Sequence, residues 1–570
     1  MVSVYHAKLH LATFLLALLP YWGPTVVAYA EPPKDYTAPR KTEAAITTTP
    51  DAPATATDAP ATAAAPVRTF FIQEYRVSGS KILTPAQIGE TVYPFLGLGR
   101  TVDDVEQART ALEKVYHDKG YQTVSVQIPE QKGRGGVVFL EVVETKVGRL
   151  RVKGSRYYSL DAIRRGAPSI APGKVPNFSD LTREIIGLNQ WPDRRVTVTS
   201  ESIRPGAEPG TVDIDLMVKD TPPLHGSIEL NNRYSPDTSE LRINGGVSYS
   251  NLWQLGHAAG VSFQVAPENT NDVKVISGYY LARLPNIDWL TLTLQATKQD
   301  SDVSTLSGAA VAGRGETVGL HANITLPQLT NYVHSISLGI DYKHYEQNVL
   351  LGLDETTAPV SYYPLSIAYS GTWLGRGEKN AYGYVTEVNA GLYFHLRGMG
   401  SSEMSFDNSR FGASGNFIYF RGDLSHEHDL PGGFQVMTKV QGQIASGPLL
   451  SAEQFSAGGL SSVRGYLEGE VPGDNAIIGS IELRSPSLIN WLNKSGEWRV
   501  YAFFDGGYVT INDPLPEQDA HWQMASIGAG SRLRIFEHLN GSIDAGLPLI
   551  SQSHTVARDW LFTFRVWADF

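Results

Sequence analysis

The sequence predicts an all-β transmembrane barrel of about sixteen antiparallel strands, preceded by two α+β domains. Three observations predict this fold class. Apolar and polar residues alternate with period two throughout residues 223–570, whereas helical periodicity is confined to the region before them. The connections between the alternating stretches are short and long in turn. Outer-membrane barrels have this pattern, because their periplasmic turns are short and their external loops are long.

The composition of the 570 residues suits a β-rich chain with many turns. The sequence contains 55 Gly, 10% aromatic residues and only 18% charged residues. The mean hydropathy of −0.18 excludes a bundle of transmembrane helices. It does not exclude a barrel, because apolar and polar residues alternate along barrel strands and their hydropathies average out. The net charge of −11 argues against a nucleic-acid partner. The lack of cysteine excludes disulfides and thiolate metal sites.

Residues 1–30 have the pattern of a secretory signal peptide. Lys8 precedes an apolar run at 11–19, and the small residues of Ala28-Tyr29-Ala30 mark a cleavage site. Residues 31–68 are rich in Pro, Ala and Thr, and their apolar area is too small to offset the entropy lost on ordering. We therefore expect a disordered linker there, and export to a periplasm.

An internal repeat lies between residues 69 and 222. Arg76-Val77-Ser78-Gly79-Ser80 recurs 75 positions later as Arg151-Val152-Lys153-Gly154-Ser155. Each copy predicts a strand, two helices and two strands. In the first copy the second helix is expected to begin after an N-cap at Thr101 and to end at Gly120. Its predicted core face consists of Val105, Ala108, Leu112 and Val115.

These patterns predict three folded parts in the mature chain. The first α+β domain is expected at 69–146, the second at 147–222 and the barrel at 223–570. Strand alternation is clear at the end of the chain, where Phe562, Phe564 and Val566 are expected to face lipid, and Thr563 and Arg565 the lumen. A β-sandwich would also alternate, but the unequal connections favour a barrel.

Two short motifs stand out in the predicted barrel. Val463-Arg464-Gly465-Tyr466 lies in the long connection 451–475, which is the sixth external loop by this strand count. Phe503, Asp505 and Gly507 share one face of a strand expected at 497–510. Because a carboxylate facing lipid would be costly, that face is the lumen.

These motifs resemble those of the two-partner secretion outer-membrane transporters, the hemolysin and filamentous-hemagglutinin secretion-activation family. The repeated β-α-α-β-β unit resembles the polypeptide-transport-associated (POTRA) domain of the same insertase superfamily. The resemblance implies that the sixth loop folds back into the lumen and that Arg464 pairs with Asp505. Two arms of about twelve residues would reach far enough, since they span about 40 Å. Gly506 and Gly507 would make room for the loop, and Gly465 would supply turn freedom.

The resemblance also implies a function. The POTRA domains would bind an unfolded partner exoprotein of adhesin or hemolysin type, and the barrel, embedded in outer-membrane lipid, would carry it to the surface or medium. The Arg464–Asp505 pair would be a latch, or alternatively a static brace. A related insertase that assembles other barrels is the main alternative. Some relatives carry a plug helix before the POTRA domains, which is doubtful here because 31–68 has no capped amphipathic stretch.

Other functional classes find little support in the sequence. No Walker-type nucleotide loop is present, so we expect neither a nucleotide nor any other cofactor. No catalytic Gly-x-Ser-x-Gly or His-Glu-x-x-His pattern occurs, so an enzyme is not expected. His426 and His428 share a strand face beside Asp429, but are expected to be solvated rim residues and not a metal site. A passive porin would have no use for two POTRA domains.

Overall fold

The computed structural model describes residues 69–570 except for 132–134, 192, 286, 302, 305–310, 313, 328, 330, 352–353, 376–382, 490–495, 517 and 537. The predicted signal peptide and linker lie outside the described residues. The chain divides into two compact units between Thr221 and Pro222. Among the described residues, no helix is both long and apolar enough to cross a membrane.

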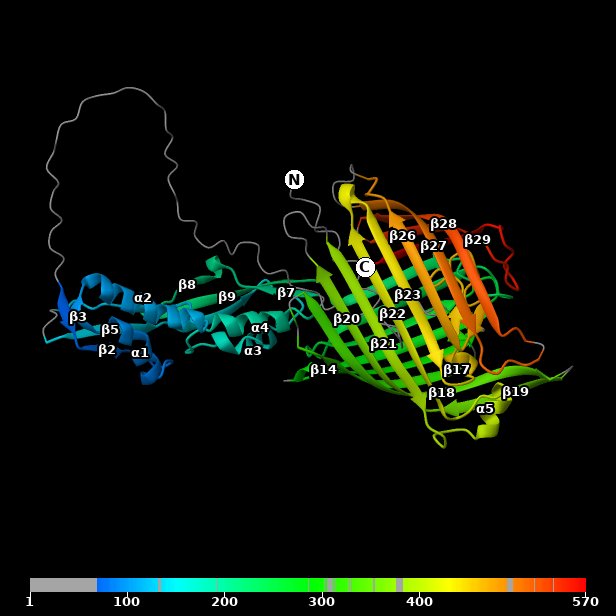
Figure 1. Ribbon diagram of the computed structural model, residues 1–570, viewed down its shortest axis with the longest axis horizontal. Coiled ribbons are helices and arrows are strands. Elements are labelled where there is room, and N and C mark those ends of the chain that lie inside the picture. Colours follow the sequence, from blue (N-terminus) through cyan, green and yellow to red (C-terminus); the bar gives the residue numbers. More distant parts are fainter. Residues whose placement is uncertain are drawn as a thin grey trace, which may run out of the picture. The chain divides into compact units, whose positions relative to one another are not determined.

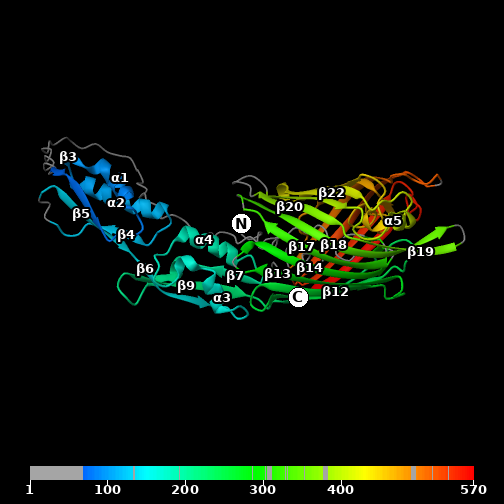
Figure 2. The same ribbon diagram turned by 90° about the horizontal axis from the view of Figure 1, so that it is seen from below.

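The first half of the N-terminal unit is a three-stranded sheet with two helices (Figure 2). Strand β5 lies in the middle, parallel to β2 and antiparallel to β4, and a small β1–β3 sheet accompanies it. Its elements are β1 (Phe70–Ile72), β2 (Glu74–Ser78), α1 (Pro85–Val92), β3 (Gly97–Arg100), α2 (Val102–Asp118), β4 (Val124–Gln127) and β5 (Val137–Glu144).

Helix α2 forms where the sequence predicts it. Thr101 and Asp104 cap each other: the Thr101 amide donates to Asp104 Oδ2 at 2.8 Å, and the Asp104 amide donates to Thr101 Oγ1 at 3.4 Å. The buried face consists of Val105, Ala108, Leu112 and Tyr116. Tyr116 replaces the predicted Val115 as the last fully buried residue of this face, because it lies four residues after Leu112.

The second half of the unit repeats the order of strands and helices. Strand β9 lies between β6, which runs parallel to it, and β7, which is antiparallel, while β8 also pairs with β9. The elements are β6 (Lys146–Lys153), α3 (Leu160–Arg165), α4 (Phe178–Leu188), β7 (Arg194–Thr197), β8 (Ile203–Pro205) and β9 (Thr211–Asp220).

The repeated Arg-Val-x-Gly-Ser segment has the same structural role in both halves. Gly79 directly follows β2 and Gly154 directly follows β6, with φ of +84° and +88°. A Cβ atom at either position would lie 2.2 Å or 2.3 Å from a backbone carbonyl oxygen, that of Val142 or that of Val218. Both the backbone conformation and the lack of space therefore require glycine.

The C-terminal unit is a closed antiparallel barrel, so the predicted fold class is confirmed. Figure 1 shows its inclined strands side by side in chain order. Seventeen described strands form the wall, but β19 and β20 pair with successive parts of β18, which gives sixteen strand positions. Strands β10 and β30 close it from Ser227↔Asp569 to Asn231↔Arg565.

The wall strands differ in length and are joined by turns and loops that contain a few short elements. The wall consists of β10 (Leu224–Asn231), β11 (Arg242–Leu252), β12 (His257–Val265), β13 (Val273–Leu284), β14 (Ile287–Ser301), β17 (Arg314–Thr325), β18 (Tyr332–Leu351), β19 (Asp354–Tyr362), β20 (Leu365–Gly375), β21 (Tyr384–His395), β22 (Phe417–Asp429), β23 (Gln435–Ala445), β26 (Asn475–Arg484), β27 (Gly496–Thr510), β28 (His521–Ile535), β29 (Leu539–Pro548) and β30 (Leu561–Asp569). The connections contain β15 (Val303–Ser304), β16 (Val311–Ala312), α5 (Glu403–Ser409), β24 (Phe455–Ala457) and β25 (Val471–Gly473).

Strand β27 shows how period two sorts side chains between the outside and the lumen. Trp498, Val500 and Phe504 are exposed on the outside, whereas Phe503 and Asp505 are buried inside the barrel. An apolar exterior suits lipid, and an inward carboxylate requires a partner in the lumen. The position of Asp505 in β27, five residues before the strand ends at Thr510, therefore determines where that partner must lie.

A buried ion pair in the N-terminal unit predicts how the stability of that unit depends on pH. Asp215 on β9 is almost fully buried, and Lys153 Nζ and Arg151 Nε lie 2.7 Å from its two oxygens. These two cations, Lys153 first, lower the pKa of Asp215 from its usual 3.8. Because the folded pKa is lowered, the stabilisation is complete above pH 3.8 and is lost as the pH falls through the folded value.

Asp215→Asn should therefore weaken hydrogen-exchange protection of β6 and β9 at pH 7 in the full-length protein. In acid below the folded pKa of Asp215, variant and parent should converge. Asp161→Asn, at the exposed Asp161–Arg164 pair, is the control and should change nothing. Equal protection of Asp215→Asn and parent at pH 7 would contradict the assignment.

Candidate functional site

The candidate site centres on loop 6, residues 446–474, which joins β23 to β26. Its arms pair only between β24 and β25, from Phe455↔Gly473 to Ala457↔Val471, and not as a hairpin of twelve residues per arm. Beyond them the tip is a compact turn. The Gly459 amide donates to the Val463 carbonyl at 3.1 Å, and the Gly458 amide donates to Ser462 Oγ at 2.8 Å.

Arg464 at the tip binds Asp505 on β27. Its Nε donates to Asp505 Oδ2 at 2.7 Å and its Nη2 donates to Oδ1 at 2.8 Å, so the contact is bidentate. The backbone amide of Arg464 also donates to Oδ2, at 3.0 Å. The side chains are 8% and 0% exposed. Removing one partner of such a buried pair costs about 3–5 kcal/mol.

The other members of the strand motif support the same contact. The guanidinium carbon of Arg464 lies 3.6 Å from the centre of the Phe503 ring, close enough for a cation–π interaction. A Cβ atom at Gly507 would lie 3.4 Å from Val463 Cγ2 and 2.3 Å from Ile478 Cδ1. Gly507 therefore makes room for Ile478 on β26, and the tip meets it only at an ordinary contact distance. A Cβ at Gly506 would meet only ordinary contacts, so Gly506 does not have the role expected of it.

Gly465 and Tyr466 fix the tip against β28, β29 and loop 8, residues 549–560, which joins β29 to β30. Gly465 has a φ of +89° and contacts Gly546 on β29, where a Cβ would lie 2.6 Å from the nitrogen and Cα of Gly465. The Tyr466 hydroxyl donates to the carbonyl of Ile550 at 2.7 Å, and its oxygen lies 3.0 Å from the carbonyl oxygen of Ala525. All four residues of the loop motif therefore contact the barrel interior, and Gly546 is a contact that sequence reasoning missed.

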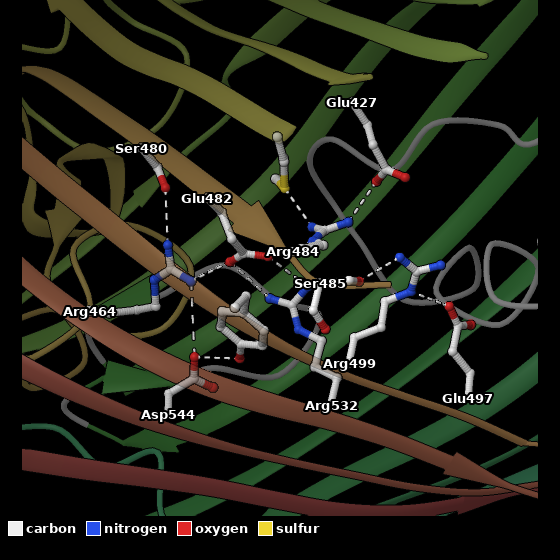
Figure 3. A network of polar contacts seen from close by, with 12 residues as sticks. Glu427, Arg464, Ser480, Glu482, Arg484, Ser485, Glu497, Arg499, Arg532 and Asp544 are labelled. Carbon is white, nitrogen blue, oxygen red and sulfur yellow. Dashed lines mark hydrogen bonds and ion pairs between the residues drawn. The ribbon is translucent and has the colours of Figure 1, made fainter. Parts of the chain in front are cut away.

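Glu482 on β26 is a further member that sequence reasoning missed. Arg464 Nη1 donates to Glu482 Oε2 at 2.5 Å, and Arg484 and Arg532 lie 2.6 Å and 3.1 Å from Oε1. Figure 3 shows Glu482 between these arginines. The sequence does contain one sign of this role: Glu482 is an acidic residue at a lumen-facing position of β26, the strand that precedes β27. It was missed because strand alternation does not give cross-strand register.

Ser480 and Asp544 complete the surroundings of the guanidinium group. Ser480 Oγ donates to Asp505 Oδ1 at 2.6 Å and accepts from Arg464 Nη2 at 3.2 Å. Asp544 Oδ1 lies 4.0 Å from Arg464 Nη1 and accepts from the Tyr501 hydroxyl at 2.6 Å. Each guanidinium nitrogen of Arg464 thus has an acceptor, as burial of this cation requires.

Four acidic residues bind loop 6 to other parts of the barrel. Glu468 accepts from Arg233 Nε at 2.6 Å, and both side chains are buried. Glu470 accepts from the Thr555 amide at 2.8 Å. The remaining two, Glu453 and Asp474, lie at the ends of the loop. Sequence reasoning missed all four, although acids in a loop that enters a lumen need partners.

The predicted rim histidines lie on β22. His426 and His428 stack with ring centres 5.8 Å apart, and Thr386 Oγ1 lies 2.8 Å from His426 Nδ1. Within the described parts of the chain, no group of three His, Cys, Asp or Glu side chains has the arrangement of a metal site. The structure brings the predicted loop motif, 463–466, to the predicted strand motif on β27, whereas these histidines lie on β22.

A closed sixteen-position barrel with a long loop bound in its lumen, preceded by repeated α+β domains, defines an outer-membrane protein transporter. The family described as haemolysin secretion/activation protein ShlB/FhaC/HecB matches residues 210–533, and the POTRA domain of ShlB type matches residues 70–145. The chain belongs to this family. The predicted family and location are confirmed: the protein is a two-partner secretion transporter of the outer membrane, with its POTRA region in the periplasm.

Similar proteins extend along most of the chain. The outer membrane transporter CdiB of Escherichia coli O6:K15:H31 (strain 536 / UPEC) is 24% identical over 520 residues, which covers 86% of this chain and 80% of that protein. The structure of CdiB from Escherichia coli has a TM-score of 0.63 at 20% identity and covers 90% of this chain and 93% of its own. The structure of CdiB from Acinetobacter baumannii has a TM-score of 0.55 at 16% identity and covers 88% of this chain and 90% of its own. These structures share the fold.

The contact between Gly465 and Gly546 can be tested by adding one methyl group. Gly546→Ala should displace the loop tip, because its Cβ would overlap backbone atoms that cannot move independently, at a cost of about 1–3 kcal/mol. Since the chain has no cysteine, the rate of thiol labelling at Val463→Cys reports the displacement. Val463 is 0% exposed, so labelling should be slow in the parent and faster in the variant.

Gly541→Ala on the same strand is the matched control. A Cβ at Gly541 would come no closer than 3.8 Å to its nearest neighbour, the Arg565 carbonyl oxygen. It should leave labelling of the cysteine at 463 unchanged. Equal labelling in the Gly546 and Gly541 variants would show that this contact does not hold the tip.

Proposed function

We propose that this transporter exports a partner exoprotein of adhesin or hemolysin type without ATP. The POTRA region binds the unfolded partner in the periplasm, and the barrel carries it to the cell surface or medium. The observation that supports this proposal best is the tip of loop 6, held inside the lumen by ion pairs and hydrogen bonds around Arg464. A pore closed by such contacts can be opened without breaking a covalent bond or unfolding the wall.

The charges around Arg464 suit a loop tip that leaves its partners to open the pore and then binds them again. When Arg464 leaves, Glu482 keeps Arg484 and Arg532 as partners, so this carboxylate remains compensated. Asp505 keeps only the Ser480 hydroxyl among the contacts described above, and a buried carboxylate with so little compensation is unfavourable. The open state therefore has a moderate free-energy cost, which arises at Asp505. This cost favours return of the loop to Asp505 after export.

Binding of an unfolded partner would use the sheet edges of the POTRA region. The order β2-β5-β4 leaves β2 and β4 at the edges of one sheet, whereas in the other sheet β6 forms one edge and β7 and β8 form the opposite edge. An extended peptide can add to such an edge by backbone hydrogen bonds. This mode is compatible with many sequences, as a translocating chain requires. Folding of the partner outside the cell would then make return through the pore unfavourable.

The partner can be identified by comparing the proteins of the medium and cell surface in strains with and without this gene. Loss of one large β-rich protein is the expected result. Depletion of many outer-membrane barrels would instead indicate an insertase, and unchanged fractions would contradict both functions.

Breaking the latch should impair export without unfolding the barrel. Arg464→Ala removes every guanidinium contact to Asp505 and Glu482, and we expect export to fall by roughly tenfold or more. Assembly is checked by heat-modifiable migration in gels, and export by the amount of partner in the medium. Arg464→Lys is the conservative variant and should retain part of the function, because it keeps the charge but loses the bidentate contact. Wild-type export by Arg464→Ala would contradict a latch.

Exchanging the two charges is not a clean rescue experiment in this protein. An aspartate at position 464 would face Glu482, whose Oε2 now lies 2.5 Å from Arg464 Nη1. The aspartate side chain is shorter than that of arginine, but two carboxylates facing each other still repel, so Arg464→Asp with Asp505→Arg should restore less export than it would beside a neutral residue 482. Adding Glu482→Gln to the exchange should improve the rescue, with partner secretion as the measurement.

A further inference from the structure

A further buried ion pair, between Glu453 and Lys343, holds loop 6 near its first end. Glu453 is 1% exposed, and its Oε1 accepts hydrogen bonds from Lys343 Nζ at 2.5 Å and the Tyr362 hydroxyl at 2.7 Å. Its Oε2 accepts from the Tyr419 hydroxyl at 2.7 Å. The Glu453 carbonyl accepts from Gln443 Nε2 at 3.1 Å. The residue is therefore bonded through both its side chain and its backbone.

The surroundings of this ion pair are apolar and aromatic. Tyr393 and Phe417 on the wall, Phe406 of α5, and Leu449 and Leu450 of loop 6 belong to one buried cluster around it. Figures 1 and 2 show α5 beside β19 at one end of the barrel. In such surroundings a carboxylate is stable only with its cation and hydrogen-bond donors in place.

The strands that hold Glu453 are not the strands that hold Arg464. Lys343, Tyr362 and Tyr419 belong to β18, β19 and β22, which are positions seven, eight and ten of the wall. The partners Glu482 and Asp505 belong to β26 and β27, positions twelve and thirteen. Besides the contacts of Glu468 and Glu470, loop 6 is thus attached to two separate parts of the wall, one near its first end and one at its tip.

The other end of the loop is also attached. Asp474, directly before β26, accepts from Arg410 Nη2 at 2.6 Å and from the Asn512 amide at 2.7 Å. Arg410 directly follows α5 in loop 5, residues 396–416, which joins β21 to β22. This contact therefore joins loop 5 to loop 6. The two ends of loop 6 are therefore fixed independently of Arg464.

We propose that Glu453 is a positioning residue of the latch: its bonds to Lys343, Tyr362 and Tyr419 set where the tip of loop 6 meets Asp505. This inference rests on the proposed latch function. When Arg464 releases Asp505, Glu453 keeps the end of the loop in place, so the tip moves about a fixed end. The tip then returns to the same partners after the exported chain has passed.

Thiol labelling in the full-length protein tests this proposal, because the chain has no native cysteine. A single cysteine at Val463 reports the tip, and one at Leu450 reports the fixed end; the parent residues are 0% and 3% exposed. Each reporter is placed in the parent, in Arg464→Ala and in Glu453→Gln. Glu316→Gln, which breaks the exposed Lys298–Glu316 pair, is the matched control.

We expect Arg464→Ala to speed labelling at 463 but not at 450. Glu453→Gln should speed labelling at both positions, by about tenfold or more, because a buried charge pair has lost one partner. The control should change neither rate. Faster labelling at 450 alone in Glu453→Gln, or at neither position, would overturn the positioning role. Exposure of 450 by Arg464→Ala would show that the two attachments are not separate.

A second variant keeps the test decisive if Glu453→Gln does not assemble. Tyr362→Phe with Tyr419→Phe removes two hydroxyl donors to Glu453 but retains Lys343, and it should speed labelling at both positions to a smaller extent. Unchanged labelling in this variant would overturn the proposal. Failure of the proposed export function is distinguishable, because it would appear as normal secretion by Arg464→Ala despite exposure of the tip.

Discussion

The buried guanidinium group of Arg464 is the interaction on which the rest of the site depends. A cation removed from water inside a barrel is stable only if acceptors surround it. Asp505, Glu482 and Ser480 supply them from two adjacent strands, and Phe503 covers one face of the group. The same requirement explains why the tip is compact, since only a tight turn presents both the side chain and its own amide to Asp505.

The attachments of loop 6 differ in kind, and that difference decides which part of the loop can move. At the tip, charges are shared among several arginines and carboxylates, so one contact can be lost while most groups remain compensated. At Glu453 the ion pair lies among aromatic side chains, where a lost partner is not replaced. A loop with an exchangeable attachment at its tip and fixed attachments at its two ends can move locally without leaving the pore.

The repeat and the barrel meet different physical demands in one chain. In the periplasmic unit, helices cover one side of small sheets, and glycine at the same place in each copy allows a close backbone approach. In the barrel, closure removes the sheet edges and period two separates a lipid-facing surface from a lumen. The open sheet edges of the N-terminal unit suit the proposed peptide binding, and the closed wall of the barrel suits membrane passage.

The sequence alone determined the fold class, because alternation and helical periodicity are local patterns that burial enforces. It also indicated the loop and strand motifs, and strand periodicity placed Asp505 on the lumen face. Tertiary structure decided what those motifs contact. Glu482, Gly546 and Glu453 come into place through strand register and barrel closure, which depend on pairing between segments far apart in sequence. No local pattern encodes such neighbours, so the wider network around Arg464 could be seen only in the folded chain.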